Sequence, residues 1–304
     1  IKVKKFGSLL LSLVFFIMLP AAAMAEAKIG GNLRVCYNLS GADDTDTFEF
    51  DRLAIKFKSF LSEDHGFHSE VQFRNPGKNN PSGGDIRLEN AYYYQTNIFG
   101  RDELNIGYIP ITWHADKSMT ILRSLASNLM AGNSVGIKYR LKGEEFSITG
   151  SVTNAANEQK SNSHKTGYDL GIRGEFSPAT GLTLGAGVCN DIHDAKDEHS
   201  ILRIVVDGLY SWGALELYGE FVSLKETVYG NSKDAENGFY IEGNYALTGN
   251  FTAYTGITSA KDLIDDHIVI GGKYQLTSGT ALQGEYVDTK NADWGFSLRV
   301  RVDF

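Results

Sequence analysis

Basic side chains at every second position are the feature of this 304-residue chain most able to do chemistry. Arg52, Lys56 and Lys58 share one parity, and Arg299 and Arg301 share another. Residues two apart in an extended strand point to the same face of a sheet. Rows of fixed positive charge attract and orient anions. The spacing therefore predicts a charged surface that selects solutes, with no catalytic residue among its members.

Other reactive groupings are weaker. The segment 193–199 holds histidines and acids that could bind a divalent cation, but a solvated acidic loop explains it better. No Ser-His-Asp grouping follows a nucleophile elbow, and no metalloprotease motif is present. The sequence therefore predicts no enzyme, no metal site and no cofactor.

The elements that would hold the bases are strands with one apolar face and one polar face. The segment 294–304 shows the pattern most clearly, because six apolar positions alternate with polar ones. The apolar positions are Trp294, Phe296, Leu298, Val300, Val302 and Phe304. A transmembrane β-barrel uses such strands, with the apolar side toward lipid and the charged side toward a water-filled interior.

Sixteen such segments can be marked along the chain, each bounded by turn residues. The connections between them alternate between tight turns and longer polar loops. This alternation is typical of an all-β, antiparallel up-and-down barrel whose short turns are periplasmic. Fourteen or eighteen strands are alternatives. The predicted strands are 29–39, 47–61, 67–75, 85–97, 103–110, 134–142, 145–153, 166–177, 182–191, 199–212, 214–224, 237–247, 251–260, 265–276, 280–288 and 292–304.

Aromatic residues are expected to mark the periplasmic strand ends, since amphipathic rings prefer the membrane interface. These are Phe60, Phe99, Tyr210, Trp212, Tyr245 and Phe304. The two cysteines, Cys36 and Cys189, fall on strands near opposite walls of such a barrel, so both are expected to be free thiols.

The first 25 residues have the features of a secretory signal peptide. Three lysines precede an apolar run, and the run ends before the small-x-small sequence Ala23-Met24-Ala25. The expected division is a signal peptide over 1–25 and one barrel domain over 26–304. Removing the three lysines changes the net charge from −8 to −11. This charge excludes nucleic acid as a partner, because phosphates would be repelled.

The connection Ile111–Asn133 is unusually long for a barrel loop. Its apolar residues recur at helical spacing at Ile121, Leu122, Leu125 and Leu129. A short amphipathic helix needs an apolar surface to rest on, and the inner wall of the barrel offers one. Inward folding would make this segment a constriction loop and bring His114, Lys117 and Arg123 to the narrowest point. The alternative is packing over the outer mouth or against a neighbouring subunit.

Several segments resemble the phosphate-selective porin family of bacterial outer membranes. They are "FDRLAIKFKSFLSEDHGFHSEVQF" (50–73), "LENAYYYQ" (88–95), "LNIGYIP" (104–110) and "RSLASNLMAGNSVGIKYR" (123–140). The resemblance implies a sixteen-stranded homotrimeric porin that passes small anions. A terminal Phe304 resembles the closing residue of proteins recognised by the barrel-assembly machinery. The chain departs from the family in the early hairpin, where Arg52 is followed by lysines rather than by stacked arginines.

If apolar faces meet lipid, the inward charges divide into a basic wall and an acidic wall. Strands 8 to 15 supply the acids, including Asp169, Asp207, Glu242 and Glu285. Such opposed walls would set a field across the pore. The alternative is that the inward charges simply pair across strands. The predicted pore-lining and constriction residues are Arg34, Arg52, Lys56, Lys58, Arg74, His114, Lys117, Arg123, Lys138, Arg140, Arg299 and Arg301.

The expected function is that of an outer-membrane porin for small hydrophilic solutes, with a preference for anions. It would be integral to the bacterial outer membrane, in contact with its lipid, with both termini periplasmic. A structural alternative is a plugged barrel that acts as a scaffold or partner in an envelope complex. A third hypothesis, an outer-membrane lipase, has no support in the residues.

Overall fold

The computed structural model describes residues 26–40, 45–74, 85–110, 112–114, 118–119, 133–154, 168–192, 199–228, 231–260, 263, 265–290 and 294–304. The predicted signal peptide and much of the segment 111–132 lie outside these ranges. Within the described residues, no helix is long and apolar enough to cross a membrane.

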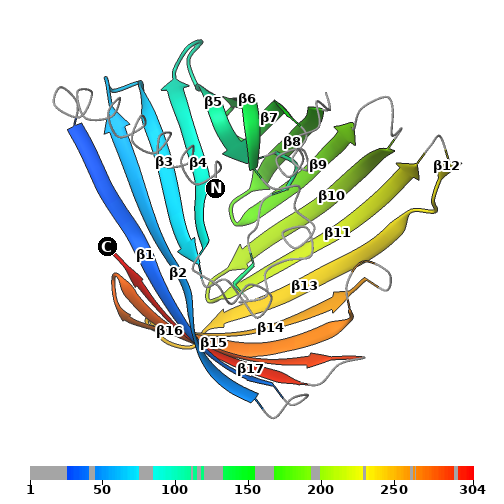
Figure 1. The fold of residues 1–304 in the computed structure, drawn as a ribbon. Coiled ribbons are helices and arrows are strands. Elements are labelled where there is room, and N and C mark those ends of the chain that lie inside the picture. The colour runs from blue at the N-terminus through cyan, green and yellow to red at the C-terminus, as the bar shows by residue number, and fades with distance from the viewer. Residues whose placement is uncertain are drawn as a thin grey trace, which may run out of the picture.

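The described residues form a closed antiparallel β-barrel (Figure 1). Each strand pairs with its neighbours in the chain, and β17 returns to pair with β1. The strands are β1 (Glu26–Ser40), β2 (Thr45–Phe60), β3 (His65–Arg74), β4 (Asp85–Thr96), β5 (Asp102–Pro110), β6 (Asn133–Lys142), β7 (Phe146–Asn154), β8 (Tyr168–Ala179), β9 (Leu182–Ile192), β10 (His199–Trp212), β11 (Leu215–Val228), β12 (Asn231–Ser232), β13 (Glu236–Ala246), β14 (Phe251–Ser259), β15 (His267–Thr277), β16 (Thr280–Thr289) and β17 (Gly295–Asp303).

Sixteen of these strands make the wall in the described part of the chain, and the prediction of a sixteen-stranded barrel is confirmed. The remaining strand, β12, has two residues and pairs with the end of β11, while β11 and β13 pair directly. Each predicted strand matches an observed one within a few residues. The alternation of apolar and polar residues was sufficient to locate them.

Side chains alternate between an exposed apolar outer face and a buried polar inner face. In β8, Leu170 and Ile172 are 41% and 56% exposed, whereas Asp169 and Arg173 are 0% and 5% exposed. Because the barrel is closed, the buried parity must point inward. The outer face is therefore apolar enough for lipid, as a membrane barrel requires.

Two β-bulges, in β2 and β4, shift this alternation, and two further register irregularities lie beside the turns of the pairs β8–β9 and β15–β16. The pairing of β1 with β2 passes from Arg34–Arg52 to Val35–Phe50, so Asp51 is the extra residue. The pairing of β3 with β4 similarly leaves Glu89 unpaired. A bulge reverses the parity of the residues before it relative to those after it. Phe48 and Phe50 thus face outward, although Arg52 on the same parity faces inward.

The tight connections and the C-terminal residue share one end of the barrel. Phe304 exchanges two backbone hydrogen bonds with Gly31, with N···O distances of 2.8 and 3.1 Å. A side chain at Gly31 would lie 2.7 Å from the Phe304 ring, so glycine permits this close approach. Glu26–Gly31 of β1 lie at the same end as the turns that follow β2, β4 and β6.

The expected aromatic residues at this end are mostly exposed. Phe99 and Trp212 are 85% and 71% exposed, and Tyr210, Tyr245 and Phe304 are also exposed. Phe60 departs from the expectation. Its ring lies beneath two inward-facing lysines, Lys28 and Lys58, so it belongs to the inner face. Cys36 in β1 and Cys189 in β9 are buried free thiols on well-separated strands, as predicted.

Candidate functional site

An arginine row crosses the inner face where the barrel closes. Arg34 in β1 is directly opposite Arg301 in β17 on one side and Arg52 in β2 on the other. The backbone register continues the row to Arg74 in β3, whose side chain lies outside the described set. Neighbouring strands are about 4.8 Å apart, so this row packs like charges closely. Like charges directly opposite one another destabilise a sheet, which indicates a functional reason for the row.

Carboxylates lie beside two of the arginines at this seam. Arg299, beside it, has its guanidinium Nη2 3.7 Å from Asp51 Oδ2 and its Nε 3.4 Å from Cys36 Sγ. Arg301 Nε lies 2.9 Å from Asp303 Oδ1. Arg34 makes no ion pair within the described part of the chain. The bulge in β2 supplies Asp51, so this acid lies beside the row because of the backbone irregularity.

Two lysines continue the positive charge along β2 toward the short-turn end. Lys56 Nζ is 3.8 Å from Glu70 Oε2 on β3, and the lysine side chain is 47% exposed. Lys58 has no carboxylate partner among the described contacts and lies over the rings of Phe60 and Tyr94. The predicted basic wall is thus assembled from β17, β1 and β2.

Lys138 and Arg140 are not part of that assembly. They lie on the inner parity of β6, and β3, β4 and β5 separate β6 from β2. The Arg140 side chain instead extends toward β8, where its Nη2 lies 3.6 Å from Glu175 Oε2. Lys138 and Arg140 therefore form a second basic group, with three strands between them and β2.

The opposite wall is acidic, buried and paired. Arg173 forms a bidentate pair with Asp207, with N···O distances of 2.7 and 2.9 Å, and also contacts Glu175 at 3.2 Å. Farther round the barrel, tyrosines bond the glutamates two residues on. Tyr218 donates to Glu220 at 2.7 Å, and Tyr240 donates to Glu242.

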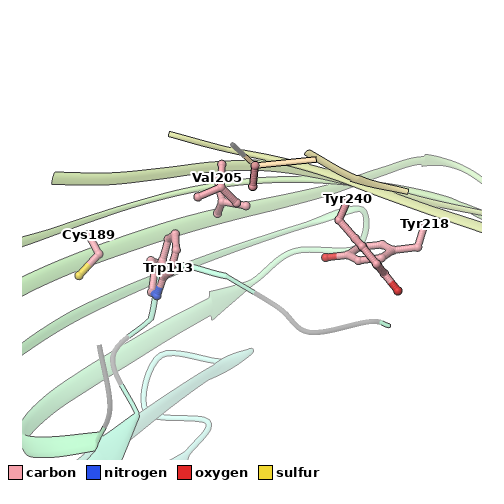
Figure 2. Packing of buried hydrophobic residues seen from close by; sticks show 7 residues of the cluster. Trp113, Cys189, Val205, Tyr218 and Tyr240 are labelled. Atoms are coloured by element: carbon pink, nitrogen blue, oxygen red, sulfur yellow. The ribbon is translucent and has the colours of Figure 1, made fainter. Parts of the chain in front are cut away.

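The start of the predicted constriction loop rests on this acidic wall. Trp113 is 1% exposed and packs with Cys189, Val205, Tyr218 and Tyr240 on the inner face (Figure 2). The Trp113 backbone can approach the wall closely because the wall residue facing it, Gly187, has no side chain. A Cβ atom at Gly187 would be 1.7 Å from the Trp113 carbonyl oxygen.

The same arrangement holds one residue earlier. A Cβ atom at Gly171 would lie 2.3 Å from the Thr112 carbonyl oxygen, and the Thr112 N–H donates to Ser151 Oγ at 3.2 Å. Gly171 on β8 and Gly187 on β9 therefore form a glycine seat, where the loop backbone contacts the wall directly.

Met119 anchors the loop at a second point. Its N–H donates to Glu242 Oε1 at 2.7 Å, and its carbonyl accepts from Gln283 Nε2 at 2.8 Å. Gln283 also donates to Tyr254 at 2.8 Å, and Tyr254 donates to Glu285 at 3.1 Å. Both backbone groups of one loop residue are thus satisfied by inward side chains of β13 and β16.

The described loop residues therefore contact the acidic wall. His114 lies beside Trp113, with ring centroids 5.1 Å apart. Lys117, Arg123 and the predicted helix over 121–129 lie outside the described residues, and so does the acidic segment 193–198. Inward folding of the whole segment remains a prediction.

Several inward charges were missed in the sequence, among them Asp51, Arg87 and Lys28. Arg87 is opposite the inward Gln72 because of the bulge at Glu89. Lys28 precedes the predicted start of β1. A change of phase in the apolar alternation could have revealed both bulges, since Phe48 and Phe50 give way to Leu53 and Ile55.

In the ranges that the structure covers, no cluster of three or more His, Cys, Asp or Glu residues could hold a metal ion.

Comparison with known proteins places this geometry in a family. The barrel is similar to Salmonella typhi OmpF in complex with daunomycin (TM-score 0.71, 11% identity, 92% of this chain and 98% of that chain). It is also similar to an anion-selective porin from Comamonas acidovorans (TM-score 0.65, 14% identity, 92% and 100%). A trimer form of in-vitro folded OmpT from Vibrio cholerae gives a TM-score of 0.64 at 16% identity (92% and 99%).

At these identities the structural likeness shows the fold alone. No protein with a curated description matches the sequence. The sequence profile of one family, however, matches residues 10–293, which is most of the chain. The chain belongs to the Gram-negative porin family, whose members are outer-membrane channels.

Proposed function

We propose that this porin passes small hydrophilic solutes through a water-filled pore and prefers anions. The pore-lining residues would be the arginine row with Arg299, together with Lys56 and Lys58. Lys138 and Arg140 on β6 would line the pore beyond β4 and β5, apart from the arginine row. Arg74 would line the same wall as the arginine row, and His114, Lys117 and Arg123 would lie near the constriction. The similarity to an anion-selective porin supports the direction of this preference.

The difference in exposure between the two walls is the observation that carries the proposal. On the basic side, the Lys56 and Arg301 side chains are 47% and 43% exposed, although each lies beside a carboxylate, and Arg299 is 16% exposed. On the acidic side, Asp207, Glu242 and Glu285 are no more than 4% exposed, and their charges face arginine, tyrosine hydroxyls or the loop backbone. A solute in the pore would meet exposed bases and covered acids, and such a field favours anions.

Planar-bilayer recording of the purified protein tests this proposal. We expect conductance steps in molar KCl and, in a KCl gradient, a reversal potential of the sign that indicates chloride preference. The double variant Arg34→Gln, Arg301→Gln should lower the chloride-to-potassium permeability ratio by about two- to threefold per charge removed. Arg101→Gln is the matched control, because Arg101 lies in an exposed turn and pairs with Glu144 at 3.6 Å. Cation preference in the parent protein would refute the proposal.

The second candidate function is a plugged barrel with a structural role. Anchoring of the loop at both Trp113 and Met119, on strands from β8 round to β16, favours it. It predicts no conductance until Ile111–Asn133 is deleted. A parent protein that conducts in its intact form would exclude it.

The assembly and placement of the protein complete the proposal. We infer a homotrimer, as in the trimer form of the Vibrio cholerae OmpT, and insertion by the barrel-assembly machinery through Phe304. Both termini would be periplasmic, after removal of residues 1–25. Phosphate selectivity, which the narrower resemblance implies, would appear as higher permeability to phosphate than to chloride in the same recordings.

A further inference from the structure

A lysine–aromatic cluster lies on the inner face at the short-turn end, away from the arginine row. Lys28 in β1 is directly opposite Lys58 in β2. Arg34 lies six residues from Lys28 along β1, a separation of roughly 20 Å at the rise of a strand. The cluster is therefore a separate feature of the vestibule.

The ammonium groups of Lys28 and Lys58 both lie against aromatic rings. Lys28 Nζ and Lys58 Nζ are 5.1 and 4.9 Å from the Phe60 ring centroid, and Lys58 Nζ is 5.0 Å from that of Tyr94. Cation–π contacts of this length stabilise an ammonium without neutralising it. Glu26 lies 3.7 Å from Lys28, and both of these side chains are largely exposed, so their pairing is weak.

The neighbouring strands extend the aromatic surface. His68 in β3 is opposite Lys58, and its ring centroid is 5.1 Å from that of Tyr92 in β4. Tyr94 reaches across β3 because Gly66 has no side chain there. A Cβ atom at Gly66 would be 2.8 Å from the Tyr94 hydroxyl oxygen. Two ammonium groups, of which Lys28 is weakly paired with Glu26, thus border a wall of rings on three adjacent strands.

We propose that this cluster is a binding subsite for aromatic carboxylates that enter the pore. The carboxylate would pair with Lys58 and Lys28, and the ring of the ligand would lie against the aromatic wall. Apolar contact with the wall favours an anion that carries a ring over one that is fully hydrated. The proposal deepens the anion preference inferred above and rests on the porin being open to solutes.

Binding of benzoate to the full-length protein in detergent micelles, measured by isothermal titration calorimetry, tests the subsite. Acetate and cyclohexanecarboxylate are the matched ligands, since they remove the ring or its aromatic character. We expect benzoate to bind more tightly than either. Equal affinity for benzoate and acetate would overturn the proposal, whether or not the protein conducts ions. Absence of conductance with intact benzoate binding would instead count against the proposed porin function alone.

Variants locate the site. Lys58→Gln should weaken benzoate binding roughly three- to fivefold, and the addition of Lys28→Gln should bring the loss to about tenfold. Phe60→Leu should remove the preference for benzoate over cyclohexanecarboxylate. Lys142→Gln, which removes an exposed lysine from the inner parity of β6 at the same end, should leave binding unchanged.

Heat-dependent migration on a denaturing gel verifies that each variant is folded. If Lys58→Gln does not fold, the exposed Lys28→Gln carries the comparison alone. Benzoate affinity that is unchanged in a folded variant lacking either lysine would refute the assignment.

Discussion

At the scale of single residues, charge placement separates the two walls of this barrel. Lys56 and Arg301 are more than 40% exposed, whereas Asp207 and Glu242 on the opposite wall are hydrogen-bonded and no more than 4% exposed. The charge pattern in the sequence predicts a basic wall and an acidic wall. It could not show which charges pair, because Arg140 with Glu175 and Arg299 with Asp51 depend on the register of the strands.

The loop between β14 and β15 gives a prediction for one carboxyl group. The Ala260 N–H donates to Asp266 Oδ1 at 3.0 Å, and Lys290 Nζ lies 3.3 Å from Oδ2. These contacts, the backbone bond first, lower the pKa of Asp266 below its ordinary value. A lowered pKa in the folded state stabilises the fold above the unfolded pKa of about 3.9, and the effect is lost as pH falls through the folded pKa.

Asp266→Asn should therefore lower the urea midpoint of unfolding in micelles at pH 7, and the difference from the parent should shrink below about pH 4. The exposed neighbour Asp265→Asn is the matched control for removal of one negative charge. A difference that stays constant from pH 7 to pH 2 would contradict the assigned contacts.

At the scale of elements, apolar alternation predicted every long strand, because each strand must separate lipid from an aqueous interior. The bulges were not predicted, since one extra residue reverses parity without breaking the alternation on either side. The anchoring of Met119 to Glu242 and Gln283 was also beyond the pattern. Those contacts join residues more than 120 positions apart in sequence, and only the closed barrel brings them together.

The bulge in β2 predicts that deletion of Asp51 is tolerated. Without this residue, Phe50 stays outward and Arg52 stays inward in an unbroken alternation. The deletion also removes the carboxylate 3.7 Å from Arg299, so the chloride preference should rise. Reversal potentials of the deletion and of Asp51→Ala should shift in the same direction. A deletion variant that loses heat-dependent gel migration would show that the bulge is required for the fold.

The glycine seat predicts how the loop responds to a wider side chain. Gly187→Val would place atoms where the Trp113 carbonyl now lies, so Trp113 should leave its pocket. In a background with Trp212→Phe and Trp294→Phe, acrylamide should quench the remaining tryptophan weakly in the parent and strongly in the variant. Gly150→Val on β7 is the control, because no atom lies within 4 Å of a Cβ there. Equal quenching in all three proteins would contradict the seat.

At the scale of the whole molecule, closure between the first and last strands creates the arginine row. Arg34 and Arg301 are 267 positions apart in sequence and directly opposite in the barrel. The alternation within each strand could indicate only that both face inward. The height along the barrel axis at which Arg34 and Arg301 become neighbours depends on the stagger of all the strands. No local sequence pattern encodes this stagger.

A cysteine already present at this seam allows the closure to be tested. Cys36 in β1 is directly opposite Arg299 in β17, and both native cysteines are free. Directly opposite residues of an antiparallel pair have Cβ atoms about 4.5–5.5 Å apart, close to disulfide range. Mild oxidation of an Arg299→Cys variant should therefore link the ends of the chain and leave Cys189 as the one free thiol.

The link would enclose most of the polypeptide, so the boiled, unreduced protein should migrate faster on a denaturing gel than the reduced sample. Adding Cys36→Ser should abolish this difference, whereas adding Cys189→Ser should not. If oxidised Arg299→Cys protein keeps all its thiols, β1 and β17 do not meet in this register. The arginine row and the anion preference that depends on it would then both be wrong, because the same pairing places Arg301 beside Arg34.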